Sequence, residues 1–400
     1  MVGAIIFVAT YILISFRRLG YLPLGRAGGA LLGAVACVAF GVIPASEALG
    51  CVDGDTILLL FGMMGIGAFL ELDEFPQRAV GFVARRVRTR GRLLALVIWG
   101  AGIGSALITN DAMCVLGAPI VVALVRAHDL PATPYLVGLA TGANTGSVAT
   151  LVGNPQNMLC ASLGGLGYRE YFVRMLPLAI VALVINHAVI AWLHRKELEG
   201  ELAPPSIRPP LVNRSIALTF AVIFLATGLY LAGFHLAWSA VAGFTVLLVM
   251  QRKDATLVWP KIEWSVLLFF ASLFIVVQGL TRTGATEWFF DHVPLEGSGG
   301  LPRLSGIFLL GSNVVSNVPF ILVVRSQVDA LADPHRGWML LAMASTFAGN
   351  LTLLGSVANV IVSERSRDVG GYGFWAYTRL GFPIAILTTA VGTAWLYVGG

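Results

Sequence analysis

The sequence predicts an all-α, polytopic membrane protein made of two inverted-topology repeats, with about ten spanning helices, two re-entrant hairpins and two discontinuous helices. Composition, uncharged runs and the placement of basic residues carry this prediction. Of the 400 residues, 57% are hydrophobic and 12% are charged, against about 25% charged residues in an ordinary soluble domain. Such a chain is too apolar for disorder, and its 4 cysteines are too few for a disulfide scaffold.

Uncharged runs along the chain have the length of membrane-spanning helices. A bilayer core takes about 20 apolar residues per helix, and runs such as 175–194 and 337–363 hold no Asp, Glu, Lys or Arg. Barrel strands would be about 10 residues long and would alternate strictly, unlike these runs. We predict spanning helices at 3–17, 28–46, 55–71, 135–163, 171–194, 214–232, 235–250, 264–282, 338–363 and 375–398.

Basic residues set the orientation, because cytoplasmic loops carry an excess of Lys and Arg. We place the N-terminus outside and let segments 92–126 and 302–325 each enter and leave by one face. Twenty of the 26 basic residues then lie inside. A single spanning helix at either segment would move later basic loops to the wrong face, so we predict two re-entrant hairpins. The apolar stretch before Arg17 reads as a first spanning helix and not as a cleaved signal.

A stretch with four prolines between positions 204 and 210 predicts a cytoplasmic linker at 196–213. The first repeat would span 1–195 and the second 214–400. Each predicted half holds five spans and one hairpin, and an odd number of spans inverts the second half relative to the first. Inverted repeats are typical of secondary transporters. The similar pairs of segments are 55–62 with 264–271, 109–111 with 316–318, and 151–157 with 353–359.

The tip of the first hairpin is polar. Thr109-Asn110-Asp111 separates two apolar arms of about 15 residues, each about 22 Å long as a helix. Asn and Asp there can cap the second arm and aim its free N–H groups at a ligand. Capping alone is the alternative interpretation.

Two further segments break the apolar runs with polar residues. Pro155 interrupts the span 135–163, and the matching span 338–363 carries Asn, Ser and Thr. We predict discontinuous helices, which bind ions and substrates in transporters; an ordinary kinked helix is the alternative. Together with both hairpin tips they predict one composite central site. Its candidate residues are Thr109, Asn110, Asp111, Asn144, Thr145, Ser147, Gly153, Asn154, Pro155, Asn157, Ser316, Asn317, Pro319, Asn350, Thr352, Gly355, Ser356 and Asn359.

Asp111 is the only acidic residue deep in the apolar runs. A carboxylate within the membrane is costly and marks a functional site by default. It could carry a proton, ligate a cation or hydrogen-bond the substrate, and the alternative is a carboxylate that only caps its helix. Cys114 and Cys160 follow the first-half motifs and could meet a soft metalloid, although buried cysteines usually act as small hydrophobes. The arginines of 85–92 predict a stretch at the surface of anionic lipid and not a nucleic-acid site.

The motifs resemble those of the ion-transporter superfamily, which holds ArsB-type arsenite efflux permeases, YbiR-like anion permeases and sodium-coupled dicarboxylate symporters. Segments 141–158 and 349–360 carry the resemblance, and 165–171 resembles ArsB proteins in particular. The resemblance implies a scaffold domain, a moving transport domain with elevator-type motion, a homodimer and a bacterial-type plasma (inner) membrane. It also implies a cytosolic ATPase partner, as in some arsenite pumps.

Two departures from the dicarboxylate pattern bear on the substrate. In the symporters both tips read Ser-Asn-Thr, whereas here Asp111 would repel a dianion and Val318 removes a hydroxyl. No Lys or Arg lies within 112–125, 130–168 or 304–324 to compensate. Arsenite at neutral pH is an uncharged trihydroxide that suits Asn, Ser and Thr. We therefore expect proton-coupled efflux of arsenite and antimonite. The alternative is a sodium- or proton-coupled carrier of an inorganic anion or dicarboxylate.

The third hypothesis for the function is a membrane enzyme or a channel. The sequence shows no pair of metal-ligating histidines and no nucleophile motif. We expect no cofactor and no resident metal ion, with H⁺ as the coupling ion and Na⁺ as its alternative.

Overall fold

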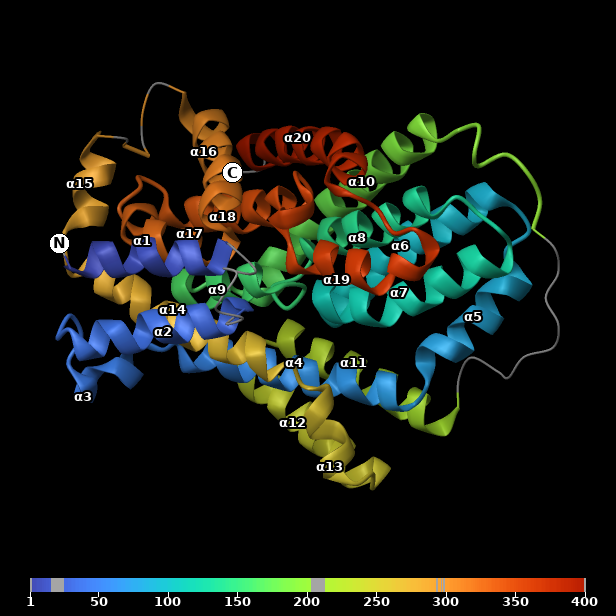
Figure 1. The fold of residues 1–400 in the computed structure, drawn as a ribbon, viewed down its shortest axis with the longest axis horizontal. Helices are drawn as coiled ribbons and strands as arrows, with labels where there is room; N and C mark the ends of the chain where they lie inside the picture. Colours follow the sequence, from blue (N-terminus) through green and yellow to red (C-terminus); the bar gives the residue numbers. More distant parts are fainter. Residues whose placement is uncertain are drawn as a thin grey trace.

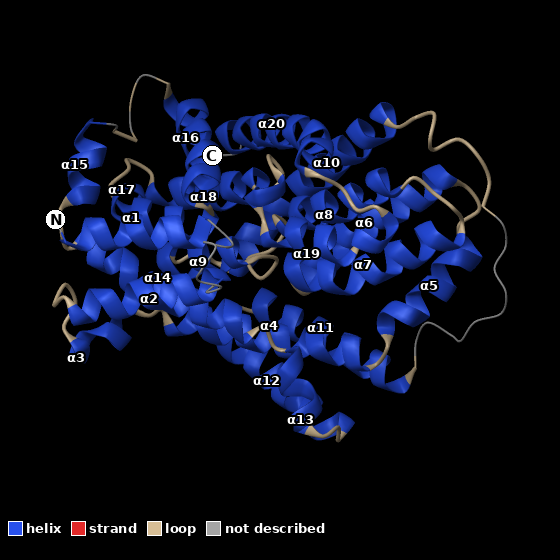
Figure 2. Ribbon diagram, in the orientation of Figure 1, coloured by secondary structure: helices blue, strands red, loops and turns tan. Residues whose placement is uncertain are grey.

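The computed structural model describes residues 2–15, 25–202, 213–292, 294–295, 297 and 299–398. Within these residues the chain forms α-helices joined by short 3-10 turns, and its one β-type pairing is the isolated bridge between Thr89 and Glu201. Helices such as α1, α2 and α20 run along the long axis of the molecule, whereas α15 and α16 stand across it (Figures 1 and 2). The predicted all-α class is confirmed.

The predicted spanning helices are present with boundaries shifted by a few residues. Those long and apolar enough to cross a membrane are α4 (Gly54–Leu72), α7 (Asn110–Ala127), α10 (Tyr168–Leu193), α11 (Arg214–Leu231), α14 (Trp264–Thr281) and α20 (Phe374–Val398). Three shorter apolar helices are α1 (Val2–Ser15), α2 (Gly25–Ala39) and α12 (Leu236–Gln251). We had assigned α7 to a hairpin arm, but its length and composition alone also suit a full span.

Both predicted hairpins form. The first joins α6 (Arg90–Leu107) to α7, and Gly104 of α6 packs on Met113 of α7. The second joins α16 (Gly300–Val315) to α17 (Asn317–Asp329), where Gly311 packs on the ring of Phe320. That these hairpins re-enter the membrane stays a prediction.

Both predicted discontinuous helices are broken at their polar motifs. The first consists of α8 (Ala132–Ser147) and α9 (Pro155–Gly164). The second consists of α18 (Pro334–Ala348), the 3-10 turn η3 (Leu353–Gly355) and α19 (Val357–Arg365). Lipid leaves no water for free backbone groups, so each break needs its own hydrogen-bond partners.

One asparagine supplies these partners in each break. Asn157 Nδ2 donates to the carbonyls of Ser147 and Thr150, at 3.1 and 2.9 Å. Asn359 Nδ2 donates to the carbonyls of Gly349 and Thr352, at 2.7 and 3.1 Å. The two breaks therefore share one pattern of contacts, which supports a repeat; the inversion of the second copy stays a prediction.

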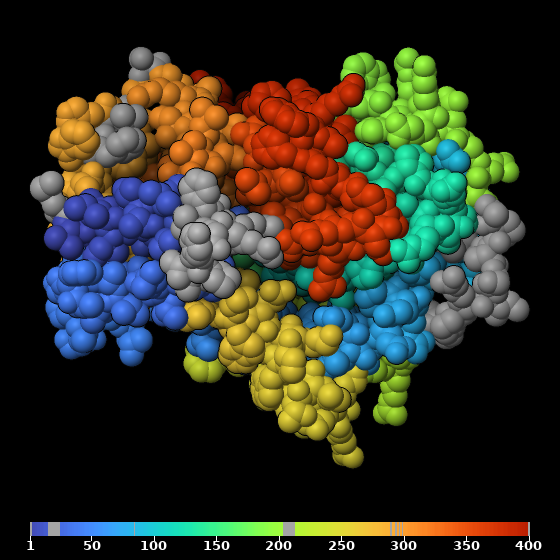
Figure 3. Space-filling view, viewed as in Figure 1, coloured from blue at the N-terminus to red at the C-terminus, as the bar shows by residue number. Residues whose placement is uncertain are grey.

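Helices of the predicted halves interleave instead of forming two separate bodies. Helix α14 packs on α1 and α2, α12 packs on α4, α18 packs on α9, and α20 packs on α10. Figure 3 shows early segments (blue) beside late ones (orange and red) on one face. The predicted division into 1–195 and 214–400 is not tested by this packing, and the four prolines of the predicted linker lie outside the described residues, as do Arg17 and Arg18.

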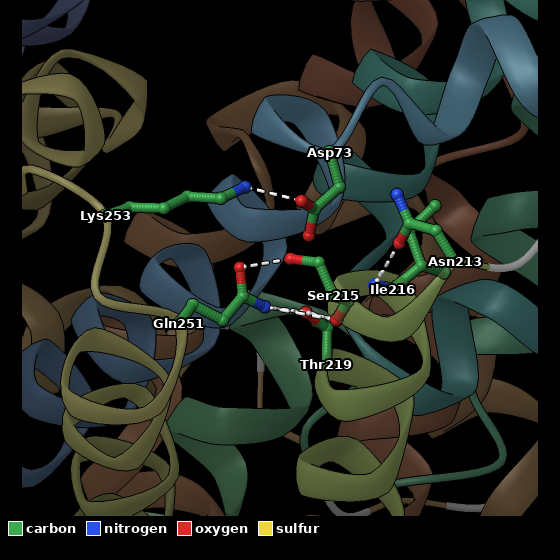
Figure 4. A network of polar contacts seen from close by, with 7 residues as sticks. All are labelled: Asp73, Asn213, Ser215, Ile216, Thr219, Gln251 and Lys253. Carbon is green, nitrogen blue, oxygen red and sulfur yellow. Dashed lines mark hydrogen bonds and ion pairs between the residues drawn. The ribbon is translucent and has the colours of Figure 1, made fainter.

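A polar network ties α4, α11 and α12 together at one end of the molecule (Figure 4). Lys253, just after α12, pairs with the buried Asp73 after α4 at 2.5 Å. Gln251 of α12 donates to Thr219 Oγ1 of α11 at 2.8 Å and accepts from Ser215 Oγ at 2.6 Å. Removing one partner of a buried ion pair costs several kcal/mol, so this network holds the three helices as a unit.

Short helices that we had not predicted join the long ones. They are α3 (Ala45–Ala48), α5 (Phe75–Arg86), α13 (Ala255–Val258) and α15 (Ala285–His292). Helix α5 carries phenylalanines and arginines at helical spacing, and the left-handed Glu74 (φ 57°) turns the chain into it.

Candidate substrate site

Asn144, near the end of α8, is the centre of a buried amide cluster formed with Asn110, Asn350 and Asn359. Its Oδ1 accepts from Asn110 Nδ2 at 2.9 Å and from Ser356 Oγ at 3.1 Å. Its Nδ2 donates to Asn350 Oδ1 at 3.1 Å and to Asn359 Oδ1 at 2.9 Å. An amide side chain has two donors and two main acceptor sites, so Asn144 is saturated, and it joins the first hairpin to the second broken helix.

Further hydrogen bonds hold the amide cluster from both sides. Asn350 Nδ2 donates to Thr145 Oγ1 at 2.9 Å, and Asn186 of α10 donates to the same oxygen at 3.0 Å. Asn154 Nδ2 donates to Ser147 Oγ at 2.7 Å and to Thr346 Oγ1 at 3.0 Å. We had not included Asn186 or Thr346 among the candidates, because single polar residues in apolar helices carry no spacing signal.

The tip of the first hairpin is docked on the first break. The Asn110 N–H donates to the Gly153 carbonyl at 2.8 Å. The cap of α7 is Thr109, whose Oγ1 accepts from the Ala112 N–H at 3.2 Å. The N-cap is therefore Thr109 and not Asn110 or Asp111 as we expected, although Asn110 Oδ1 does accept from one first-turn N–H, that of Asp111, at 2.9 Å. Asn110 instead turns to Asn144, which leaves Asp111 in the first turn of α7.

The second hairpin tip docks on the second break in a looser way. Asn317 Nδ2 donates to the Gly355 carbonyl at 3.0 Å. Ser316 has φ 70° and makes no side-chain cap for α17. Positive φ is costly for a residue with a Cβ atom and concentrates at functional sites.

A cavity of about 890 Å³ lies against both tips. A second cavity of about 470 Å³ adjoins it, and Asp111, Glu263 and Ser265 line both. Asp111 is partly exposed there, and the backbone of Ala358 at the start of α19 hydrogen-bonds to its carboxylate. The carboxylate thus lies where a helix N-terminus favours negative charge.

The predicted site residues fall into two groups. Those that line the two cavities are Thr109, Asn110, Asp111, Pro155, Ser316, Asn317, Gly355 and Ser356. The buried residues behind them are Asn144, Thr145, Ser147, Asn154, Asn157, Pro319, Asn350 and Asn359. Gly153 and Thr352 lie in the breaks, and Thr352 Oγ1 donates to Asn313 Oδ1 at 3.4 Å. Cys114 and Cys160 are fully buried and line neither cavity.

Charged residues that we had treated as loop residues line the main cavity. They are Arg26 of α2, Glu263 before α14, Glu364 of α19 and Arg367. Segments 112–125, 130–168 and 304–324 hold no Lys or Arg. We expected that no cation would therefore offset the charge of Asp111 and of an anionic substrate, and this is wrong, because Arg26 and Arg367 line the same cavity. These side chains lie at helix ends, and only the packing of distant helices brings them to Asp111.

Two buried amide oxygens of cavity-lining residues have no hydrogen-bond partner among the residues that the structure describes. They are Oδ1 of Asn317 and Oε1 of Gln156, on side chains that are 5% and 8% exposed. The Asn317 assignment is fixed, because its Nδ2 already donates to a carbonyl. A buried acceptor without a donor costs about 1–3 kcal/mol. Gln156 was missing from our candidates, although it lies inside the motif 153–157.

The bundle, its broken helices and this buried polar site are those of a secondary membrane transporter. The chain belongs to the citrate transporter family, whose family model matches residues 11–348. It is a multi-pass membrane protein by its apolar helices and its relatives.

Relatives cover nearly the whole chain. The silicon efflux transporter LSI3 of Oryza sativa is 29% identical over 98% of this chain and 96% of its own length. A putative transporter arsB of Dictyostelium discoideum is 26% identical over 97% and 90%. The inner membrane protein YbiR of Escherichia coli is 27% identical over 87% and 88%. The YdaH transporter of Alcanivorax borkumensis shares the fold, with a TM-score of 0.58, 14% identity and coverage of 100% and 98%.

Proposed function

We propose that this transporter exports arsenite, and antimonite, in exchange for protons by an elevator-type alternating-access mechanism. The observation that carries the proposal is that two cavity-lining residues, Asn317 and Gln156, each hold a buried amide oxygen without a hydrogen-bond partner among the described residues, which a bound ligand would reach once these side chains turn toward the cavity. A ligand that satisfies them must donate hydrogen bonds. An uncharged trihydroxide does so through its hydroxyls, whereas a carboxylate or sulfate dianion only accepts.

Asp111 is the residue that we propose to carry the proton. It lines the same cavity as Asn317 and Gln156, so a proton on Asp111 and a bound substrate would compete for that cavity. Proton release by Asp111 would then follow from substrate binding on one side of the membrane. Lys261 and Arg365 line the adjoining cavity, and they belong to loops predicted to be cytoplasmic. A cavity open to the cytoplasm suits export.

The names of two relatives support a hydroxylated metalloid as substrate. One is a silicon efflux transporter and the other a putative transporter arsB. We further propose that the chain works as a homodimer in a bacterial-type inner membrane, as the resemblance implies, with a cytosolic ATPase as an additional partner.

A second candidate function is sodium- or proton-coupled transport of an inorganic anion or a dicarboxylate. Arg26 and Arg367 on the cavity wall favour it, as does the description of the family model. The cavity also holds Asp111, Glu263 and Glu364, which offset these cations.

A panel of fluxes separates the two candidates. Purified protein in vesicles is given arsenite, sulfate or succinate under proton and sodium gradients. We expect arsenite flux that follows the proton gradient and expression that protects arsenite-sensitive cells. Sodium-driven succinate or sulfate flux without arsenite flux would establish the second candidate.

A further inference from the structure

A third cavity, of about 330 Å³, shares no lining residue with the main cavity and only Leu116 with the adjoining one. It is a groove between α5, the α6–α7 hairpin, and helices α4 and α11, with α5 at one end of the molecule (Figure 1). Every side chain that lines it is apolar, including Phe82, Ile120 and Phe220. Ile103 on its wall is 58% exposed, so the groove opens to the outside of the molecule, where a spanning bundle meets lipid.

The helix that closes one side of the groove is amphipathic and positively charged. Phe75, Ala79, Phe82 and Val83 of α5 line the groove. No acidic residue occurs between Glu74 and Asp111. Exposed arginines gather where α5 ends and α6 begins, namely Arg85, Arg86, Arg88 and Arg92.

One arginine links this charge to the groove. The guanidinium of Arg86 lies 4.9 Å from the centroid of the Phe82 ring, and Phe82 is on the groove wall. Arg88 follows two residues later, and its carbonyl accepts from the Leu202 N–H at 2.9 Å. The guanidinium of Arg86 therefore lies at the basic end of the groove, and the backbone of Arg88 is held close by in the chain.

We propose that this groove binds an anionic phospholipid of the bilayer, with one acyl chain along its apolar walls and the headgroup phosphate at Arg86 and Arg88. Apolar surface in a membrane is covered by acyl chains, and arginine binds phosphate through paired N–H donors. Arginine near a membrane surface adds attraction for anionic lipid. The bound chain contacts α7, the helix that begins at the Asp111 hairpin tip, and also α4 and α11. It thus lies between the hairpin and the helices that the Lys253 network ties together.

Gly100 offers a way to fill the groove without disturbing the fold. It lines the groove, and a Cβ atom added there meets no atom within 4 Å. Gly228 of α11 is a matched control, because it also has open space for a Cβ atom and does not line the groove. Ile103→Trp is a second filling variant, on the exposed rim.

The experiment uses phosphatidylglycerol and phosphatidylcholine that carry a photoactivatable acyl chain. The full-length protein is reconstituted in vesicles with each lipid, irradiated, and mapped by peptide mass spectrometry. We expect phosphatidylglycerol to label peptides of α5, α6 and α7. Gly100→Leu and Ile103→Trp should abolish this labelling, and Gly228→Leu should leave it unchanged.

The headgroup is tested with the double variant Arg86→Gln, Arg88→Gln. Its labelling by phosphatidylglycerol should fall roughly 25-fold, at about fivefold per arginine, to the level of phosphatidylcholine. Equal labelling of the unaltered protein by both lipids would overturn the proposal. Groove labelling that survives both Gly100→Leu and Ile103→Trp in monodisperse protein would also overturn it.

Discussion

The two hairpin tips occupy matching places in the chain but are built differently. The first is capped by Thr109, its Asn110 side chain is bonded to Asn144, and it carries the carboxylate of Asp111. The second has Ser316 at φ 70° without a side-chain cap, and Asn317 keeps a buried oxygen without a partner. The comparison teaches that the side chains of the first tip are held by hydrogen bonds within the protein, whereas the second tip has a costly backbone angle and a buried oxygen without a partner among the described residues.

The largest effect is expected at the charged tip. Asp111→Asn keeps the shape of the side chain but removes its proton-carrying function, so proton-driven arsenite flux in vesicles should fall on the order of 100-fold, as when a required proton-transfer group is removed. The matched control is Asp55→Asn, in the first turn of α4, where the carboxylate pairs with His235 at 3.3 Å. Full activity of Asp111→Asn would show that the first tip carries no proton.

The second largest effect is expected at Asn144, whose hydrogen bonds hold the first hairpin tip in place. Asn144→Ala removes four hydrogen bonds and leaves the Oδ1 atoms of Asn350 and Asn359 buried without this donor. The free energy of unfolding should fall by about 3 kcal/mol or more. Thermal unfolding in detergent measures it, with Thr245→Ala as control, since Thr245 is exposed on α12 and bonds only to its own helix. An unchanged melting temperature for Asn144→Ala would contradict the role of the amide cluster.

A paired substitution separates the two tips directly. Asn110→Ala should lower stability by about 1–2 kcal/mol, because the side chain makes two buried hydrogen bonds, one as donor and one as acceptor. Asn317→Ala removes one bond but also one unpaired acceptor, so stability should change little. Its apparent affinity for arsenite should instead fall about fivefold, through loss of a hydrogen bond of about 1 kcal/mol. Equal effects of both substitutions on stability and affinity would show that the two tips do not differ in how their asparagines are bonded.

The smallest effects are expected in the backbone and caps, and they have opposite signs. Ser316→Gly should raise the free energy of unfolding by about 1 kcal/mol, because glycine adopts positive φ without strain. Thr109→Ala should lower it by about 1 kcal/mol through loss of the cap. Chemical denaturation of both variants gives the two signs, and a loss of stability in Ser316→Gly would show that the second tip is not strained.

The sequence predicted the helices and the polar motifs well, because a span needs a long uncharged run and a break needs Gly, Pro or Asn. It predicted that Asn110, Asn144, Asn350 and Asn359 share a site, but not that Asn144 bonds the other three. Such pairing depends on side-chain directions across helices that are far apart in the chain.

Other residues of the site could not be predicted from the sequence, because their positions also depend on the packing of distant helices. Glu263 and Arg26 lie at helix ends, where charge is ordinary, and only the packing of α2 on α14 and of α14 on α17 brings them to the cavity. Helix α5 was not predicted, because its arginines indicate only a stretch at the membrane surface. Its apolar side forms a groove only together with α7 and α11, which are distant in the chain from it or from each other. Asn317 Oδ1 stands out because it has no hydrogen-bond partner among the described residues. The lack of a partner leaves no pattern in the sequence.

Proton movement triggered by substrate tests the central claim most directly. Protein is reconstituted in vesicles that enclose a pH-sensitive dye, without an imposed gradient, and arsenite or succinate is added outside. We predict that arsenite changes the internal pH, that succinate does not, and that Asp111→Asn abolishes the response. A pH change with succinate and none with arsenite would contradict the proposed site for an uncharged hydroxyl donor.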